Sequence, residues 1–106
     1  MESDDAITRM SALATPSRLK ALKMLAESGE HGLASGELAR RLDVAPNTLS
    51  TQLLLLSNAR LVRSRRESRS IIYKADLDAI RELMEFLANE CAAGRISANI
   101  RVSKRH

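Results

Sequence analysis

The chain has 106 residues, a length that supports one hydrophobic core and therefore one domain. Hydrophobic residues make up 44% and charged residues 28%, which is typical of a folded globular protein and excludes a disordered chain. The net charge is +4, aromatic residues are only 2%, and Cys91 is the single cysteine. This composition disfavours stacking of single-stranded bases on aromatic side chains, and it excludes a disulfide framework or a cysteine-rich zinc site within one chain.

Location and catalysis are both constrained by what the sequence lacks. No apolar run approaches the roughly eighteen residues of a membrane span, and the segment "MESDDAITRM" is acidic where a signal peptide would be basic and then apolar. We therefore expect a cytoplasmic protein without a membrane partner. The sequence offers no Ser/His/Asp or Cys/His set and no glycine-rich phosphate loop, so we expect no enzymatic activity.

The first half of the chain is predicted to form four helices. Ser3 is the expected N-cap of a helix over residues 3–14, and Thr15 with Pro16 is expected to start the next, which ends at Gly29 and Gly32. A short helix over residues 35–42 and a fourth helix over residues 46–58 follow a similar pattern. The apolar positions expected to face inward are Ala6, Ile7, Met10, Leu13, Ala14, Leu19, Leu22, Leu25, Leu38, Ala39, Leu42, Leu49, Leu53 and Leu56.

The pattern changes after residue 60. The stretch "LVRSRRESRSIIYKA" consists of two short runs around a polar, arginine-rich centre, and this predicts a β-hairpin with its tip near Glu67 and Ser68. A last helix is expected to begin at the cap Asp76 and to end at Gly94. Its broad apolar stripe comprises Leu77, Ile80, Leu83, Met84, Leu87 and Cys91.

The predicted order, α-α-α-α-β-β-α, is that of a mainly α winged helix-turn-helix with a small β-hairpin. We expect residues 1–94 to form the DNA-binding and dimerisation domain. Residues 95–106 carry Arg95, Arg101, Lys104 and Arg105 with no acid, and we expect them to form a basic, flexible tail.

Two groups of side chains are candidates for contacting double-stranded DNA. The fourth helix presents short hydrogen-bonding side chains suited to base edges and phosphates, and the hairpin presents arginines suited to phosphates or the minor groove. These residues are Asn47, Thr48, Ser50, Thr51 and Gln52 on the helix, and Arg63, Arg65, Arg66 and Arg69 on the hairpin. The alternative is that both groups are simply a solvated polar surface.

A homodimer would match the two half-sites of a pseudopalindromic operator, and the apolar first and last helices are the natural dimer surface. The alternative is that both helices only close the core of a single chain. A function from another class also stays open, namely a winged-helix module that binds a protein partner instead of DNA.

From Leu13 to about Gly94 the sequence resembles the ArsR/SmtB family of winged-helix bacterial repressors. "LATPSRLKALKMLAE", "GELARRLDVAPNTLSTQLLLLSNARLV" and "RSRRESRSIIYKAD" are similar to the opening helix, the helix-turn-helix and the wing of that family, in the family's order and spacing. The resemblance implies a homodimeric repressor that leaves its operator when an inducer binds. Within the family the chain is most similar to arsenical-resistance repressors, whose inducer is trivalent arsenic.

The sequence departs from that subgroup at its ligands. The subgroup's cysteines would fall at Cys91, Ala92 and Ala98 or Asn99, and only Cys91 is present. A second family site has no thiol in "GLASGELAR", and the zinc-sensing Asp-x-His pattern is replaced by Leu77-Asp78-Ala79. Arg60 stands where these repressors commonly have glycine, and Gln52 where many have histidine.

Cys91 has three interpretations. It is an apolar residue of the inner stripe, four residues after Leu87; or a redox-sensitive thiol; or the remnant of a metalloid site that binds trivalent arsenic. One thiol per chain gives a dimer two sulfurs at most, whereas trivalent arsenic ordinarily takes three.

Overall fold

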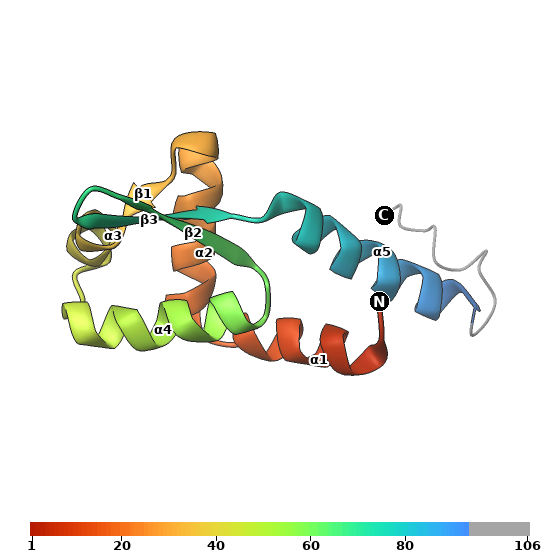
Figure 1. The fold of residues 1–106 in the computed structure, drawn as a ribbon. Coiled ribbons are helices and arrows are strands. Elements are labelled where there is room, and N and C mark those ends of the chain that lie inside the picture. The colour runs from red at the N-terminus through yellow and green to blue at the C-terminus, as the bar shows by residue number, and fades with distance from the viewer. Residues whose placement is uncertain (94–106) are drawn as a thin grey trace.

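The computed structural model describes residues 1–93, which fold into five α-helices, a one-turn 3-10 helix and a three-stranded sheet (Figure 1). This confirms the predicted order and the winged helix-turn-helix. The structure also contains a two-residue strand and a 3-10 turn, which were not predicted from the sequence. The elements are α1 (Ser3–Ala12), α2 (Pro16–Ser28), η1 (Gly29–His31), β1 (Leu33–Ala34), α3 (Ser35–Leu42), α4 (Pro46–Asn58), β2 (Val62–Glu67), β3 (Ser70–Ala75) and α5 (Leu77–Ala93).

The core is aliphatic and is built mainly from leucines. One leucine of α2, one of α3 and three of α4 meet the residue just before β2, and each is at most 1% exposed. These side chains are Leu25, Leu38, Leu49, Leu53, Leu56 and Leu61. Burying each contributes on the order of 2 kcal/mol relative to exposure, so this cluster fixes how α2, α3, α4 and the hairpin lie against one another. The inward positions predicted for α4 are confirmed.

The sheet has the order β1-β3-β2, and both pairings are antiparallel. Strand β1 pairs with β3 through Leu33 opposite Tyr73, directly after Gly32. Gly32 has a φ of 70° and lies so close to β3 that a Cβ there would meet the Tyr73 carbonyl oxygen at 2.3 Å. Glycine is therefore required at this position for both its backbone conformation and its lack of a side chain.

Two of the three predicted N-caps are confirmed. The Thr15 hydroxyl accepts a hydrogen bond from the Arg18 N–H at 3.2 Å, and the Asp76 carboxylate accepts one from the Ala79 N–H at 3.0 Å. Ser3 is not a cap, because α1 begins at Ser3 itself and Glu2 precedes it without a side-chain cap bond.

The buried face of α1 is only partly the predicted one, since Ala6 is buried and Leu13 packs against the core as predicted. Ala6, Arg9 and Ala12 are buried, whereas Ile7 is 56% exposed, Met10 is 39% exposed and Ala14 is exposed. The small alanines let α1 approach its neighbours closely, and this turns its larger apolar side chains outward. The same correction applies to Leu19 on α2, which is 46% exposed.

Helix α5 has two apolar faces, and only one is covered. Ala79 and Leu83 are buried on the first, while Leu77 is 53% exposed and Met84 64% exposed on the second. Leu87 and Cys91 continue the second face and are also exposed, so the predicted stripe exists but most of it is not in the core of this chain.

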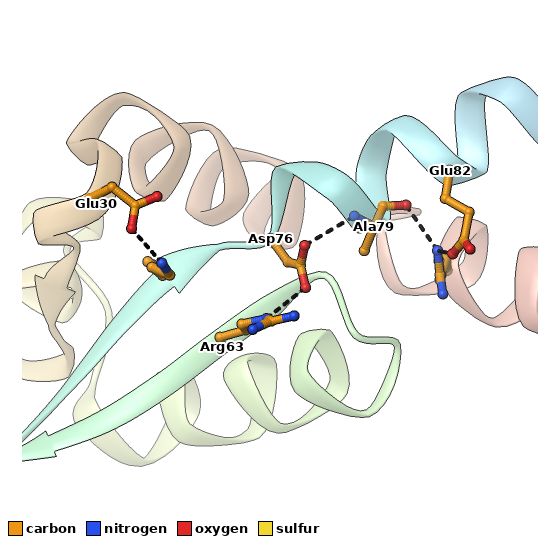
Figure 2. A network of polar contacts seen from close by, with 7 residues as sticks. Glu30, Arg63, Asp76, Ala79 and Glu82 are labelled. Carbon is orange, nitrogen blue, oxygen red and sulfur yellow. Dashed lines mark hydrogen bonds and ion pairs between the residues drawn. The ribbon is translucent and has the colours of Figure 1, made fainter.

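Arg9 is the single buried charged residue found among residues 1–93, and it connects α1 to α5. Its Nη1 donates to the Ala79 carbonyl at 2.9 Å and to Glu82 Oε1 at 2.7 Å (Figure 2). The second bond is an ion pair whose carboxylate side chain is 52% exposed. One guanidinium therefore holds the N-terminal helix against the first turns of α5.

Within residues 1–93 there is no helix that is both long enough and apolar enough to cross a membrane. The predicted helix stop at Gly94 and the predicted basic tail over residues 95–106 lie outside the described residues.

Replacing Arg9 by methionine tests the connection between α1 and α5. Arg9→Met keeps most of the buried stem but removes the charged hydrogen bonds to the Ala79 carbonyl and to Glu82, and we expect it to lower the free energy of unfolding by about 1–3 kcal/mol. The matched variant Glu82→Gln keeps an acceptor at a half-exposed position, and its cost should stay below about 1 kcal/mol. Urea unfolding followed by circular dichroism measures both, and equal losses would contradict the role given to the carbonyl.

Candidate nucleic-acid interface

A tight turn joins α3 to α4 and fixes their relative orientation. Asp43 ends α3 in the left-handed conformation, with a φ of 57°, and Asp tolerates that conformation better than most residues. The N–H groups of Asp43 and Val44 donate back to the carbonyls of Arg40 and Ala39, at 3.2 and 3.1 Å. Pro46 then starts α4, where its missing N–H costs nothing. The result is a helix-turn-helix.

The outward face of α4 consists of short polar side chains, as predicted. Asn47, Thr48, Ser50 and Thr51 are all exposed. The Ser50 hydroxyl donates to the Pro46 carbonyl at 3.0 Å, and the Thr51 hydroxyl donates to the Asn47 carbonyl at 3.4 Å. These bonds occupy the hydroxyl protons but leave the oxygens as acceptors at the surface.

Gln52 differs from the other predicted contacts because it is half-buried and already bonded. Its Oε1 accepts a hydrogen bond from Nη1 of Arg18 at 3.2 Å. Arg18 also donates from Nε to the Ala12 carbonyl at 2.6 Å and from Nη2 to the Ser11 carbonyl at 3.4 Å. A guanidinium on α2 therefore links the end of α1 to the predicted DNA-reading helix.

The strand register separates the four predicted wing arginines by their distance from the tip. Arg63 pairs with Lys74 near the base of the hairpin, whereas Arg66 pairs with Ile71 next to the last pair, Glu67 and Ser70. The turn between the strands contains Ser68, whose φ of 57° is left-handed, and Arg69. The predicted tip near Glu67 and Ser68 is confirmed.

Arg63 is held at the base of the hairpin. Its Nε donates to Asp76 Oδ2 at 2.8 Å, and the other oxygen of this carboxylate caps α5 (Figure 2). Partial burial favours a higher pKa for Asp76, but the hydrogen bonds from the Ala79 N–H and from Arg63 outweigh it and lower the pKa of this carboxyl. Arg63 thus orients the start of α5 and lies away from the tip.

Arg65 is also engaged, whereas the two arginines nearest the tip are not. Arg65 donates from Nε to Glu67 at 2.8 Å and from Nη2 to the His31 carbonyl at 3.0 Å. Among residues 1–93, neither Arg66 nor Arg69 has an ion pair or a side-chain hydrogen bond, and both are exposed. The cationic charge that remains without a carboxylate partner on the hairpin is therefore concentrated near its tip.

Figure 1 shows the hairpin tip and the first turn of α4 at the same end of the molecule, with α1 and α5 at the other end. The structure thus brings Arg66 and Arg69 to the end where Asn47 and Thr48 begin α4, but it leaves Arg63 nearer α5. DNA contact by these residues stays a prediction.

Arg60 adopts the left-handed conformation, with a φ of 63°, just before the hairpin. Its N–H closes the end of α4 by donating to the Ser57 carbonyl at 2.9 Å. This backbone conformation explains why the family pattern commonly has glycine here, since a side chain at positive φ costs on the order of 1 kcal/mol.

Cys91 lies exposed on α5, so its interpretation as a residue of the inner stripe is wrong for the single chain. Leu83 and Ala79 occupy the covered face instead. In the part of the chain that the structure describes, no three His, Cys, Asp or Glu side chains are grouped so that they could hold a metal ion.

Sequence reasoning missed Arg9 and Arg18, the two arginines that connect helices through backbone carbonyls. Arg18 lies within the quoted stretch "LATPSRLKALKMLAE", but nothing in that stretch indicates its partners, and no motif includes Arg9. Arg9 interrupts an apolar stripe, and Arg18 sits in the first turns of α2 where a solvated side chain is the ordinary expectation. Only the approach of other elements gives them partners.

Comparisons with known proteins agree with this geometry. Residues 15–64 match the family described as bacterial regulatory protein, arsR family. The biofilm growth-associated repressor of Agrobacterium fabrum is 40% identical over 78 residues, which span 74% of this chain and 64% of that repressor. The transcriptional activator HlyU of Vibrio cholerae is 31% identical over 85 residues, which span 80% of this chain and 76% of the activator.

A solved structure extends the likeness to the fold. The homodimeric winged helix-turn-helix DNA-binding domain of Mb0332 from Mycobacterium bovis, a possible ArsR-family regulator, has a TM-score of 0.68 at 25% identity. The match covers 85% of this chain and 82% of that domain. The fold and the helix-turn-helix therefore define a winged-helix regulator.

The chain belongs to the arsR family of bacterial regulatory proteins. This family consists of transcriptional regulators, which confirms the expectation of a regulator rather than an enzyme. The narrower resemblance to arsenical-resistance repressors stays a prediction.

Proposed function

We propose that this chain is a cytoplasmic, homodimeric repressor that binds a pseudopalindromic operator in double-stranded DNA. The observation that carries the proposal is the pairing of an exposed polar start of α4 with two wing arginines that lack a carboxylate partner within residues 1–93. Of the two relatives, one is named a repressor and the other an activator. We favour repression because occupying promoter DNA is sufficient for it.

In this proposal α4 enters the major groove and the wing follows the adjacent backbone. Asn47, Thr48 and Thr51 have short side chains, so contacting base edges costs them little side-chain entropy. Asparagine also suits adenine. Arg66 and Arg69 supply phosphate contacts at the tip, where neither has an ion-pair partner among residues 1–93 because the nearby Glu67 pairs with Arg65. Arg65 contributes only if phosphate replaces Glu67 as its partner.

If the tip arginines contact phosphates, removing either of them should make DNA binding less dependent on salt concentration. A duplex enriched from a randomised library would be titrated by fluorescence anisotropy at several salt concentrations. Arg66→Ala and Arg69→Ala should each weaken binding on every duplex and reduce the slope of log K against log salt by about 1. Arg81→Ala, which removes an exposed arginine from α5 at the other end, is the control and should leave the slope unchanged.

Equal slopes for all of these proteins would contradict the wing assignment. A chain that enriches no duplex from the library, yet forms a stable complex with another protein, would favour the alternative of a winged-helix interaction module without DNA binding.

The dimer is proposed to form through α1 and α5. Met10 on α1, with Leu77, Met84 and Leu87 on α5, are large apolar side chains left exposed on the two helices at one end of the molecule. Exposed apolar groups gathered in this way commonly mark a protein contact. The homodimeric state of the domain from Mycobacterium bovis supports the proposal.

A charge placed on the α5 face tests this dimer. Met84 is 64% exposed, so Met84→Glu should leave the single chain folded but weaken association by about a hundredfold or more, since the interface would bury an unpaired carboxylate. Leu54→Glu places the same charge on α4, at a residue that is 58% exposed, and should leave the dimer intact. Size-exclusion chromatography with light scattering measures both, and a native monomer at micromolar concentration would end the proposal.

Release of the operator is proposed to involve Cys91, through trivalent arsenic or a redox signal. Cys91 lies on the same exposed face of α5 as Leu87, one turn further along. In a dimer formed through this face the two thiols would lie in or beside the interface, where a bound metalloid or an oxidised sulfur would change the association of the helices.

Comparing native and Cys91→Ser protein separates the interpretations of this cysteine. Operator binding would be measured without additive, with arsenite and with peroxide. We expect one of the two reagents to release the native protein and to have no effect on Cys91→Ser, because the variant has no thiol. If the two proteins respond equally under all three conditions, Cys91 serves only as a small apolar residue of the α5 face.

A further inference from the structure

An open groove of about 330 Å³ lies between α1, the start of α2 and the second half of α4. Its apolar walls come from Ile7, Ala12 and Leu55, and its polar rim includes Arg18 and Asn58. Leu55 is 42% exposed, so apolar surface is left uncovered inside this groove as well as beside it. The volume is at the small end of the range for ligand sites, which is about 300–1,000 Å³.

Arg18 is the single cation among the residues that line this groove. Its three hydrogen bonds go to the carbonyls of Ala12 and Ser11 and to the amide oxygen of Gln52, which are all neutral acceptors. No carboxylate among residues 1–93 pairs with Arg18. Its charge is therefore uncompensated although the side chain is half-buried.

The donor count of Arg18 indicates what it can still bind. A guanidinium has five N–H groups, and the three bonds use one each from Nε, Nη1 and Nη2. One N–H remains on each terminal nitrogen, so the guanidinium still has two donors for an anionic oxygen. A single cation at the rim of an apolar groove matches one anionic head joined to an apolar tail.

We propose that this groove binds a small amphipathic monocarboxylate, with its carboxylate on Arg18 and its apolar chain along Ile7, Ala12 and Leu55. A dicarboxylate does not fit, because the lining offers no second cation. The site lies away from Cys91 on α5 and uses different chemistry, so it is a second route by which a small molecule reaches the protein.

The same guanidinium couples the site to α4. A carboxylate bound by the remaining N–H groups of Nη1 and Nη2 lies beside the hydrogen bond from Nη1 to Gln52, so it changes the surroundings of the Gln52 amide. Because Gln52 belongs to the predicted DNA-reading set, an effect of the ligand on operator binding rests on the proposed function. Binding of the ligand itself does not, and it is measurable without DNA.

Octanoate is a suitable probe, and octan-1-ol is its neutral counterpart with a chain of the same length. Isothermal titration calorimetry on the full chain should give an affinity for octanoate about tenfold or more above that for octan-1-ol, since only the anion gains charged hydrogen bonds. In a proton–nitrogen correlation spectrum, octanoate should also shift the side-chain amide of Gln52, which is the chain's only glutamine.

Two exposed leucines on α4 provide a matched pair of variants that should both fold. Leu55→Glu places a carboxylate inside the groove and should reduce octanoate affinity about tenfold or more. Leu54→Glu adds the same charge to the preceding residue, which does not line the groove. This variant should leave octanoate affinity and the Gln52 shift unchanged.

Equal affinities for octanoate and octan-1-ol, no binding of either, or equal losses in the two variants would each overturn the proposal. None of these results bears on whether the protein binds DNA. Loss of DNA binding with octanoate affinity intact would overturn only the proposed function and would leave the groove as a ligand site.

Discussion

Six leucine side chains, from α2, α3, α4 and the residue before β2, pack together at the centre of the core and hold these elements against one another. With only one phenylalanine and one tyrosine in the chain, the core is filled by branched aliphatic side chains, and three of the most deeply buried come from α4. Leu49, Leu53 and Leu56 lie along one side of that helix, so the opposite side has to face solvent. Helix α4 can therefore present a polar surface without losing its anchor, and Leu61 carries the same cluster into the hairpin.

Helix α5 depends on polar anchors more than on this cluster. Its buried apolar residues are Ala79 and Leu83, with Ile80 partly buried against the cluster, and its start is positioned by Asp76, which caps it and binds Arg63 of the wing. Arg9 then ties it to α1 through the Ala79 carbonyl. Hydrogen bonds of this kind fix direction but bury little apolar area. A helix held in this way keeps its larger apolar face available for another surface, and a second copy of the chain would cover it.

Much of the fold could be predicted from the sequence because local chemistry determines it. Thr15, Pro16, Pro46 and Asp76 begin helices for reasons contained within a few residues, and the change of period after residue 60 marks the hairpin. The orientation of α1 and α5 could not be predicted in this way. Their stripes satisfy helical spacing, but spacing does not say whether the same chain or a partner covers a stripe, and the alanines that pack against neighbours carry little signal.

The sequence was enough to predict which residues form the candidate interface. It was not enough to predict which of their charges have intramolecular partners and which do not. Four arginines of the hairpin look equivalent in sequence, yet the register brings Arg63 to Asp76, and Arg65 binds Glu67 and the His31 carbonyl. Lys74 is likewise paired with Glu30. The intramolecular partners neutralise the base of the wing and leave the positive potential at its tip. The same reasoning distinguishes Arg18, which has partners but no counter-charge within the described chain, and for that reason remains able to attract an anion.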